Sequence, residues 1–267
     1  MKKKAKRWVM LSFDTEEFDI PREQGKIIPD EEQIRVSKEG IFHVLDILKA
    51  HGVVATFYCT TKLLLGAPEI GKRIIEEGHE MASHGCDHGN PQPQHVIESK
   101  NILEKTFKVK IRGYRQPRMF AVDDATLKKE GYEYNSSINP AFIPGRYMHL
   151  SVSRTPFMKD GILQIPASVT PWFRFPLFWL SAHHLPMGIY IALVKRTLHH
   201  DGYFNTYFHP WEFYKILGVP EYGVPYIIGH NAGKPMEERL SRLIEALQAD
   251  GAEFITYETF AHKKDSL

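Results

Sequence analysis

Short apolar runs that alternate with amphipathic segments restrict the fold of this chain more than any other feature. Eight runs rich in β-branched and aromatic residues predict strands at 7–13, 53–59, 79–83, 110–115, 133–138, 162–166, 203–208 and 253–257. Six amphipathic segments predict helices at 35–50, 68–77, 93–106, 123–130, 187–199 and 236–249. Alternating strands and helices form parallel sheets that are buried on both faces. Seven or eight such units predict an α/β fold of the (β/α) barrel type rather than an open sheet.

The length of the chain fits one barrel of this kind. It has 267 residues, and a (β/α) barrel takes about 250. The apolar fraction of 43% is ordinary for a globular protein with a large core. We find no repeat, low-complexity tract or linker, so we expect residues 1–267 to form a single domain.

Charge and cysteine content restrict the partners and the compartment. The net charge is +2 and the basic residues are scattered, apart from a run in residues 1–7. We therefore expect no nucleic-acid partner, which would need a basic stripe. Two cysteines cannot build a disulfide framework and favour a reducing compartment. The apolar run 8–13 is about half as long as a signal-peptide core, so we expect a strand there and a cytoplasmic protein.

Polar side chains recur where the predicted strands end. The residues at these positions are Asp14, His84, Arg115, Ser137 and His209. In a (β/α) barrel, the carboxyl ends of the strands form one rim, and active sites lie on that rim. The sequence therefore predicts that these five side chains meet at one site.

The stretch Ser83–Gly89 predicts a metal site. It places His84 and His88 four residues apart, and neutral imidazole binds first-row divalent cations. With 14 histidines in the chain, such a pair is not specific by itself. Asp14 and Glu16 strengthen the prediction, because residues two apart in a strand share a face. One carboxylate would bind the metal and the other would accept a proton.

Two further residues suit the same chemistry. Arg115, followed by Pro117, can present its planar guanidinium to a carboxylate and keep it ionised. His209, followed by proline at the end of the predicted strand 203–208, is well placed to donate a proton.

Together these motifs resemble the NodB-type polysaccharide deacetylases (carbohydrate esterase family 4) over about residues 8–212. The likeness rests on five segments in order: Asp14 with Glu16, His84 with His88, 115–118, 134–137 and 207–209. It is strongest to the branch with D-x-[DE] and a late H-P-W-E. The resemblance implies a distorted (β/α)7–8 barrel. It also implies a divalent cation held by Glu16, His84 and His88, expected to be Zn²⁺, with Ni²⁺, Co²⁺ or Fe²⁺ as alternatives.

The resemblance further implies an enzyme that hydrolyses the N-acetyl or N-formyl group of an amino sugar in a polysaccharide or lipid-linked glycan. Asp14 would be the base, Arg115 would keep it ionised, and His209 would be the acid. We expect a backbone N–H at Tyr58, or at a neighbour after that strand, to bind the oxyanion. The residues expected to contact substrate are Pro117, Arg118, Ser137, Trp172 and Trp211.

The sequence also departs from the family pattern. The common pattern has two adjacent aspartates, whereas here the second carboxylate is Glu16, so Asp14 and Glu16 could exchange roles. Gly85 replaces a hydroxyl residue, and Asn135 stands where an aspartate is common. Three other functions therefore stay open: an esterase, a cyclic-amide hydrolase and a non-catalytic sugar-binding protein.

Residues 172–195 allow two interpretations. The stretch 175–194 has no charged side chain and is about as long as a membrane span. Pro176, Pro186 and Gly188 within it argue against a span. It is either a loop and helix that cover the barrel or an interfacial patch that contacts the inner face of a membrane.

Overall fold

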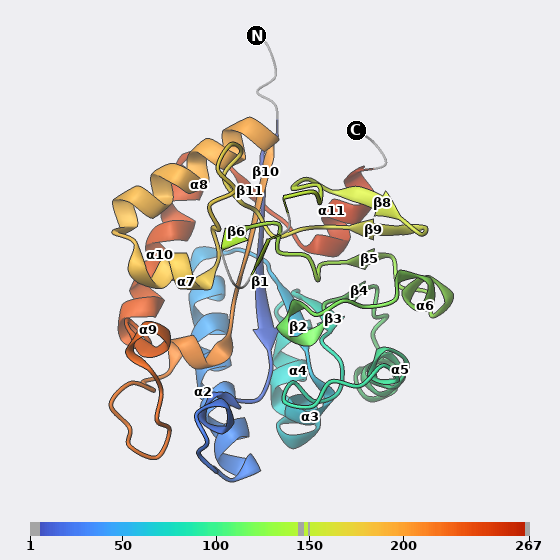
Figure 1. Cartoon of the computed structure of the whole chain (residues 1–267), viewed down its shortest axis with the longest axis vertical. Coiled ribbons are helices and arrows are strands. Elements are labelled where there is room, and N and C mark those ends of the chain that lie inside the picture. Colours follow the sequence, from blue (N-terminus) through green and yellow to red (C-terminus); the bar gives the residue numbers. More distant parts are fainter. Residues whose placement is uncertain (1–5, 144–146, 149, 265–267) are drawn as a thin grey trace.

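A curled sheet with helices around its outside forms the centre of the molecule (Figure 1). The computed structural model describes residues 6–143, 147–148 and 150–264, so most of the basic run at 1–7 lies outside it. The sheet order is β10-β1-β2-β3-β4-β5-β9-β8, and β11 pairs with the start of β1. All pairs are parallel except β8 with β9. The sheet consists of β1 (Trp8–Thr15), β2 (Thr56–Cys59), β3 (Glu80–Ser83), β4 (Gly113–Tyr114), β5 (Tyr134–Asn135), β8 (Phe157–Lys159), β9 (Ile162–Gln164), β10 (Tyr203–Phe208) and β11 (Glu253–Phe254).

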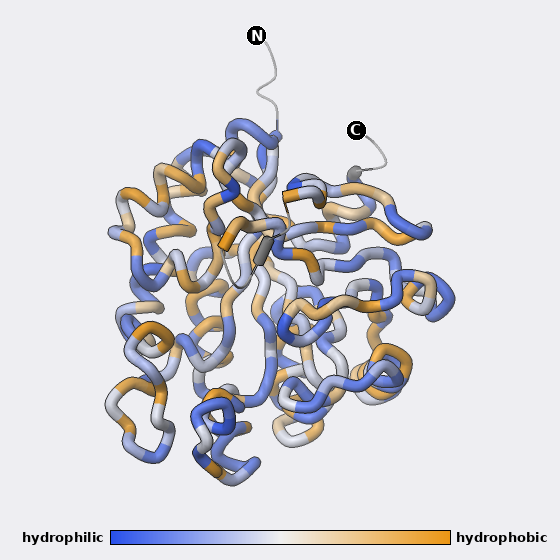
Figure 2. The backbone as a smooth tube through the Cα atoms, in the orientation of Figure 1, coloured by the Kyte–Doolittle hydropathy of each residue, from blue (hydrophilic) through white to orange (hydrophobic). Residues whose placement is uncertain are grey.

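All eight predicted strands and all six predicted helices are present, and the distorted barrel architecture is confirmed. The predicted helices are α2 (Asp30–His51), α4 (Pro68–Glu76), α5 (His95–Phe107), α6 (Asp124–Lys129), α8 (Met187–Asp201) and α10 (Lys234–Ala249). In α2, acidic residues occupy the first turn, and Gly52 ends the helix in the left-handed conformation with φ 63°. Hydrophilic and hydrophobic residues alternate along the outer helices (Figure 2).

Several short elements were not predicted, because one or two turns show no period. The helices are α1 (Ile20–Glu23), α3 (Thr61–Gly66), α7 (Trp179–His184), α9 (Tyr226–Gly229) and α11 (Tyr257–Lys264). Two 3₁₀ turns, η1 (Pro117–Met119) and η2 (Pro210–Phe213), follow β4 and β10. A small hairpin pairs β6 (Phe142–Ile143) with β7 (Tyr147–Met148).

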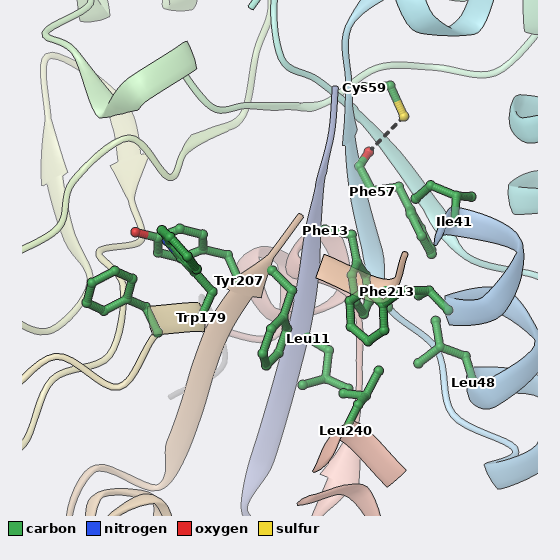
Figure 3. Packing of buried hydrophobic residues seen from close by; sticks show 14 of the residues in the cluster. Leu11, Phe13, Ile41, Leu48, Phe57, Cys59, Trp179, Tyr207, Phe213 and Leu240 are labelled. Carbon is green, nitrogen blue, oxygen red and sulfur yellow. Dashed lines mark hydrogen bonds between the residues drawn. The ribbon is translucent and has the colours of Figure 1, made fainter. Parts of the chain in front are cut away.

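Strand β1 is buried along its whole length and separates two apolar layers. Leu11 and Phe13 pack with the outer layer, beside α2, α10 and η2 (Figure 3). Met10 belongs to the cluster inside the curl of the sheet, together with Tyr58 and Tyr134. This arrangement explains why the strand is a continuous apolar run, and it holds the carboxyl end of β1 in a fixed position.

Between β9 and β10 the sheet is joined through a side chain. Asn205 of β10 is fully buried and donates through Nδ2 to the Pro166 carbonyl at 2.9 Å. Its Oδ1 accepts from the backbone N–H of Ser168 at 2.7 Å, and its own N–H donates to the Ser168 hydroxyl at 3.0 Å. Asn205 thus links β10 to the segment after β9, and these two strands are not paired with each other in the described part of the chain.

Residues 172–195 form a loop followed by α7 and most of α8. Met187, Tyr190 and Val194 of α8 are buried against the barrel, so this segment covers the sheet, as the first of the two interpretations predicts. Within the described part of the chain, no helix combines the length and apolar character needed to cross a membrane.

Candidate active site

Glu16, His84 and His88 converge at the carboxyl ends of β1 and β3. Glu16 Oε2 lies 3.3 Å from Nε2 of His84 and 3.2 Å from Nε2 of His88. The three potential ligand atoms all lie within 4.8 Å of one another, and all three side chains are buried. The predicted triad is therefore brought together in space, with two imidazoles and one carboxylate facing the same point.

The other ring nitrogens show what the triad can bind. Nδ1 of His84 lies 2.7 Å from the Arg115 carbonyl, and Nδ1 of His88 lies 2.9 Å from Asp19 Oδ2. Both Nδ1 atoms must carry hydrogen, so in the neutral rings both Nε2 atoms present lone pairs toward Glu16. Glu16 Oε2 is buried, and among the described residues it has no hydrogen-bond donor. Three acceptors that face one point repel one another unless a cation lies between them, so the donor set fits a divalent metal ion.

The charge around His88 supports the same conclusion. Burial alone would lower the pKa of this ring, but the negative charges of Glu16 and Asp19 raise it to about 9. The pocket therefore favours a positive charge, supplied by either a proton or a metal ion.

Asp14 has different neighbours from Glu16. Its Oδ1 accepts a hydrogen bond from Arg115 Nη1 at 2.5 Å. The guanidinium also donates to the Ser12 hydroxyl and to both Oγ and the carbonyl of Ser136, each at 3.0 Å. Burial acts to raise the pKa of Asp14. The charges of Arg115, His84 and His209, together with the hydrogen bond from Arg115, outweigh burial, so the pKa lies below its usual value. Asp14 is therefore an ionised carboxylate, fixed by Arg115.

His209 comes directly after β10, and its orientation is fixed by Glu212. Its Nδ1 lies 2.8 Å from Glu212 Oε1, so Nδ1 donates and Nε2 is the ring nitrogen left for other partners. The second oxygen of Glu212 lies 2.9 Å from His183 Nε2, and His183 Nδ1 faces the carbonyl of His230. Burial alone would lower the pKa of His209, but the hydrogen bond to Glu212 and the charge of Glu16 raise it. A protonated His209 is thus favoured.

Trp211 connects His209 with the triad. Its ring stacks on His209 with centroids 4.8 Å apart and 14° between the planes. Its Nε1 donates to Glu16 Oε1 at 3.5 Å. One tryptophan therefore contacts both the predicted acid and a predicted metal ligand.

Comparison with known proteins decides the family. A family model described as polysaccharide deacetylase matches residues 2–135. The chain belongs to the polysaccharide deacetylase family. The matched half contains Asp14, Glu16, His84, His88 and Arg115, whereas His209 lies beyond it.

Individual relatives of this family member match over different lengths. The peptidoglycan-N-acetylglucosamine deacetylase PgdA of Listeria monocytogenes is 42% identical over 65 residues, which is 24% of this chain and 14% of that protein. A structure from Mycobacterium smegmatis, assigned as a polysaccharide deacetylase, has a TM-score of 0.69 and 17% identity, covering 98% and 91% of the two chains. Puue allantoinase has a TM-score of 0.67 and 13% identity over the same shares. These two structures have the same fold as this chain.

The residues predicted to contact substrate do not all lie together. Pro117 and Arg118 follow β4, and Arg118 forms ion pairs with Asp19 at 3.4 Å and with Glu23 at 2.6 Å. The Ser137 hydroxyl accepts from the Gln116 N–H and donates to Asn135, so its hydrogen bonds are made within the fold.

Trp172 lies away from the triad. Its side chain is 73% exposed, and its ring contacts His200. His200 precedes the start of β10, whereas His209 of the site follows the end of that strand. The structure therefore does not bring Trp172 to the site.

The expected oxyanion-binding N–H after β2 is also not found. The N–H of Thr60 donates to the Thr15 carbonyl at 3.0 Å, and the N–H of Thr61 donates to the Gly85 carbonyl at 3.1 Å. Residue 58 itself is paired within the sheet. These groups hold the loops in place and are not directed at a ligand.

Asp19 is a site residue that the sequence analysis missed. Because it fixes the hydrogen on Nδ1 of His88, replacing Asp19 by asparagine should weaken metal binding by about 10–100-fold. Metal affinity of the purified variants, measured by competition with a chelator, checks this. Glu23→Gln is the matched control, because Glu23 also pairs with Arg118 but is bonded to neither histidine of the triad. Equal affinities in both variants would contradict the role of Asp19.

Proposed function

We propose that this protein is a metal-dependent hydrolase that removes an N-acetyl or N-formyl group from an amino sugar in a polysaccharide or lipid-linked glycan. The observation that carries the proposal is the set of three lone pairs on Glu16, His84 and His88 beside the ionised Asp14–Arg115 pair. Membership of the polysaccharide deacetylase family supports it. The Listeria relative is named for N-acetylglucosamine in peptidoglycan, which supports an amino-sugar substrate.

Glu16, His84 and His88 would hold the metal ion. Two imidazoles and a carboxylate suit Zn²⁺, and they also suit Ni²⁺, Co²⁺ or Fe²⁺. A bound divalent cation polarises the substrate carbonyl and lowers the pKa of water from 15.7 toward about 7.

The other side chains move protons. Asp14 accepts the proton of the attacking water, and Arg115 keeps Asp14 ionised before each turnover. His209 donates a proton from Nε2 to the amide nitrogen as the C–N bond breaks, since an amine leaves poorly unless it is protonated. The products are the free carboxylic acid and the free amino sugar. In this scheme Glu16 and Asp14 keep the separate roles that their different neighbours favour.

The location of the reaction is part of the proposal. We infer a cytoplasmic protein in which α7 and α8 cover the barrel. The exposed loop 172–175 at the start of segment 172–195 would meet the inner face of a membrane if the glycan is lipid-linked. The side chains of Trp172 and Phe173 are 73% and 87% exposed, which supports such a contact.

The test is amine release from a panel of N-acetylated and N-formylated amino sugars, both free and lipid-linked. We expect turnover that is lost with a chelator and restored by Zn²⁺, because the triad requires a cation. Turnover of the lipid-linked sugars alone would support action at the membrane. Release of an alcohol from acetyl esters, or opening of a cyclic amide, would favour the other hydrolases. Absence of both turnover and bound metal after reconstitution would favour a sugar-binding protein.

A further inference from the structure

We infer a second metal-binding site, separate from the triad, formed by Cys86, His95 and Glu98. The ligand atoms of these three residues all lie within 4.8 Å of one another. His95 and Glu98 are three residues apart at the start of α5, so they share one face of that helix. Cys86 comes from the loop after β3. Nothing in the proposed hydrolysis uses these side chains.

The backbone holds Cys86 in position toward α5. The carbonyl of Cys86 accepts a hydrogen bond from the N–H of Lys62 at 3.0 Å. The carbonyl of Gly85, the residue before Cys86, accepts one from the N–H of Thr61 at 3.1 Å. Gly85 has a φ of 76°, a left-handed turn that glycine adopts readily. The loop is therefore fixed against the start of α3, and the backbone position of Cys86 does not depend on a bound ion.

The carboxylate and the imidazole are both available. Glu98 is exposed, and in the described part of the chain it forms no ion pair with a lysine, arginine or histidine. His95 Nδ1 accepts a long hydrogen bond from the N–H of Gln92, at 3.2 Å. If the metal ion binds Nδ1, it replaces this hydrogen bond. If it binds Nε2, the ring hydrogen moves to Nδ1, which can then no longer accept. The hydrogen bond from Gln92 is therefore lost in either case. Gln92 is only half-buried, and water can satisfy its N–H.

The donor set selects the class of cation. Thiolate, imidazole and carboxylate together suit Zn²⁺ and similar first-row ions rather than Mg²⁺ or Ca²⁺. Zinc bonds of about 2.0–2.3 Å require ligand atoms roughly 3.3–3.8 Å apart in a tetrahedron, with water as the fourth ligand. Because the present ligand atoms lie within 4.8 Å of one another, each pair needs to approach by at most about 1.5 Å. Changes of rotamer of Glu98 and of the half-buried His95 can supply this approach.

A cation at this second site would act on the loop that carries the triad histidines. Cys86 lies two residues from both His84 and His88, and binding would tie this loop to α5. We expect the ion to raise the melting temperature of the loaded protein, since it binds only the folded chain.

Cobalt distinguishes the two sites, because only the second contains sulfur. Apoprotein titrated with Co²⁺ should bind two equivalents and develop a thiolate-to-cobalt charge-transfer band in the near ultraviolet. Cys86→Ala should lose the band and one equivalent, and His95→Ala and Glu98→Gln should weaken both. Cys59→Ala is the matched control and should keep the band, because Cys59 is the other cysteine of the chain and is buried in β2.

A double variant, Glu16→Gln with His84→Ala, separates this inference from the proposed function. It should lose the equivalent bound at the triad and keep the thiolate band. Binding of one equivalent without a band in the wild-type protein would overturn the inference. Persistence of the band in Cys86→Ala, or its loss in the double variant, would also overturn it. Circular dichroism of each variant confirms that the fold is intact.

Discussion

Replacing His209 by alanine is expected to lower turnover by about 10²–10⁴-fold while leaving the metal content unchanged. Glu212 holds Nδ1 of His209, so Nε2 is the nitrogen that would deliver a proton to the departing amine. Without that proton the tetrahedral intermediate expels water more easily than amine. His209 is not one of the three predicted metal ligands, which are Glu16, His84 and His88, so metal binding should persist.

His200→Ala is the control for this variant. His200 is an exposed histidine in the last turn of α8, and its ring is bonded to Asp201. The variant therefore removes an imidazole that lies before the start of β10, whereas His209 follows the end of that strand. Turnover with the best substrate of the panel and elemental analysis of metal are measured for both variants. Unchanged turnover in His209→Ala would contradict its role as the acid. Loss of metal in that variant would show that His209 acts through the triad instead.

The longer regular elements could be predicted because they extend far enough to show their pattern. Strand β1 and helix α2 carry a continuous apolar run and an amphipathic stripe, and both form where the sequence indicates. The grouping of Asp14, His84, Arg115 and His209 could also be predicted, because the parallel barrel places all strand ends on one rim. Topology thus supplied the site without any knowledge of side-chain contacts.

The partners of these residues could not be predicted from topology. Asp19, Glu212 and His183 each fix a ring nitrogen or a carboxylate of the site, but they lie on short elements or loops with no period. Which ring each of them contacts depends on the path of those loops. The H-P-W-E sequence contains Glu212, but spacing alone does not show that its two oxygens join His209 to His183.

The place of Trp172 in the fold could not be predicted either, for a similar reason. Trp172 follows the predicted strand 162–166 and was expected to contact substrate. Instead the chain reverses, with an antiparallel bridge between Val169 and Pro176, and this turn carries Trp172 to His200. A reversal of this kind depends on a tertiary contact, so no periodic pattern in the sequence reveals it.

Replacing Arg115 by methionine is expected to lower the free energy of unfolding by roughly 3–5 kcal/mol at neutral pH, because Asp14 is left as a buried charge without its partner. The effect should depend on pH. In the wild-type protein the pKa of Asp14 is lowered, so its contribution to stability is present above the unfolded pKa of about 3.9 and is lost as the pH falls through the folded pKa. In the variant the lowering effect of Arg115 is gone, while burial still raises the pKa of Asp14. That pKa should therefore rise, and the destabilisation should shrink as the pH falls from 8 to 5.

Urea unfolding at each pH measures this difference, and the double variant Arg115→Met with Asp14→Asn isolates its cause. The double variant removes the unpaired charge, so it should be more stable at neutral pH than Arg115→Met alone and should lose the pH dependence. Arg22→Met is the control, because the exposed pair of Arg22 with Asp30 should contribute at most about 1 kcal/mol. A destabilisation of Arg115→Met that does not change with pH would mean that the packing of Arg115 against Tyr58 and Ser136, rather than its charge, holds this part of the barrel together.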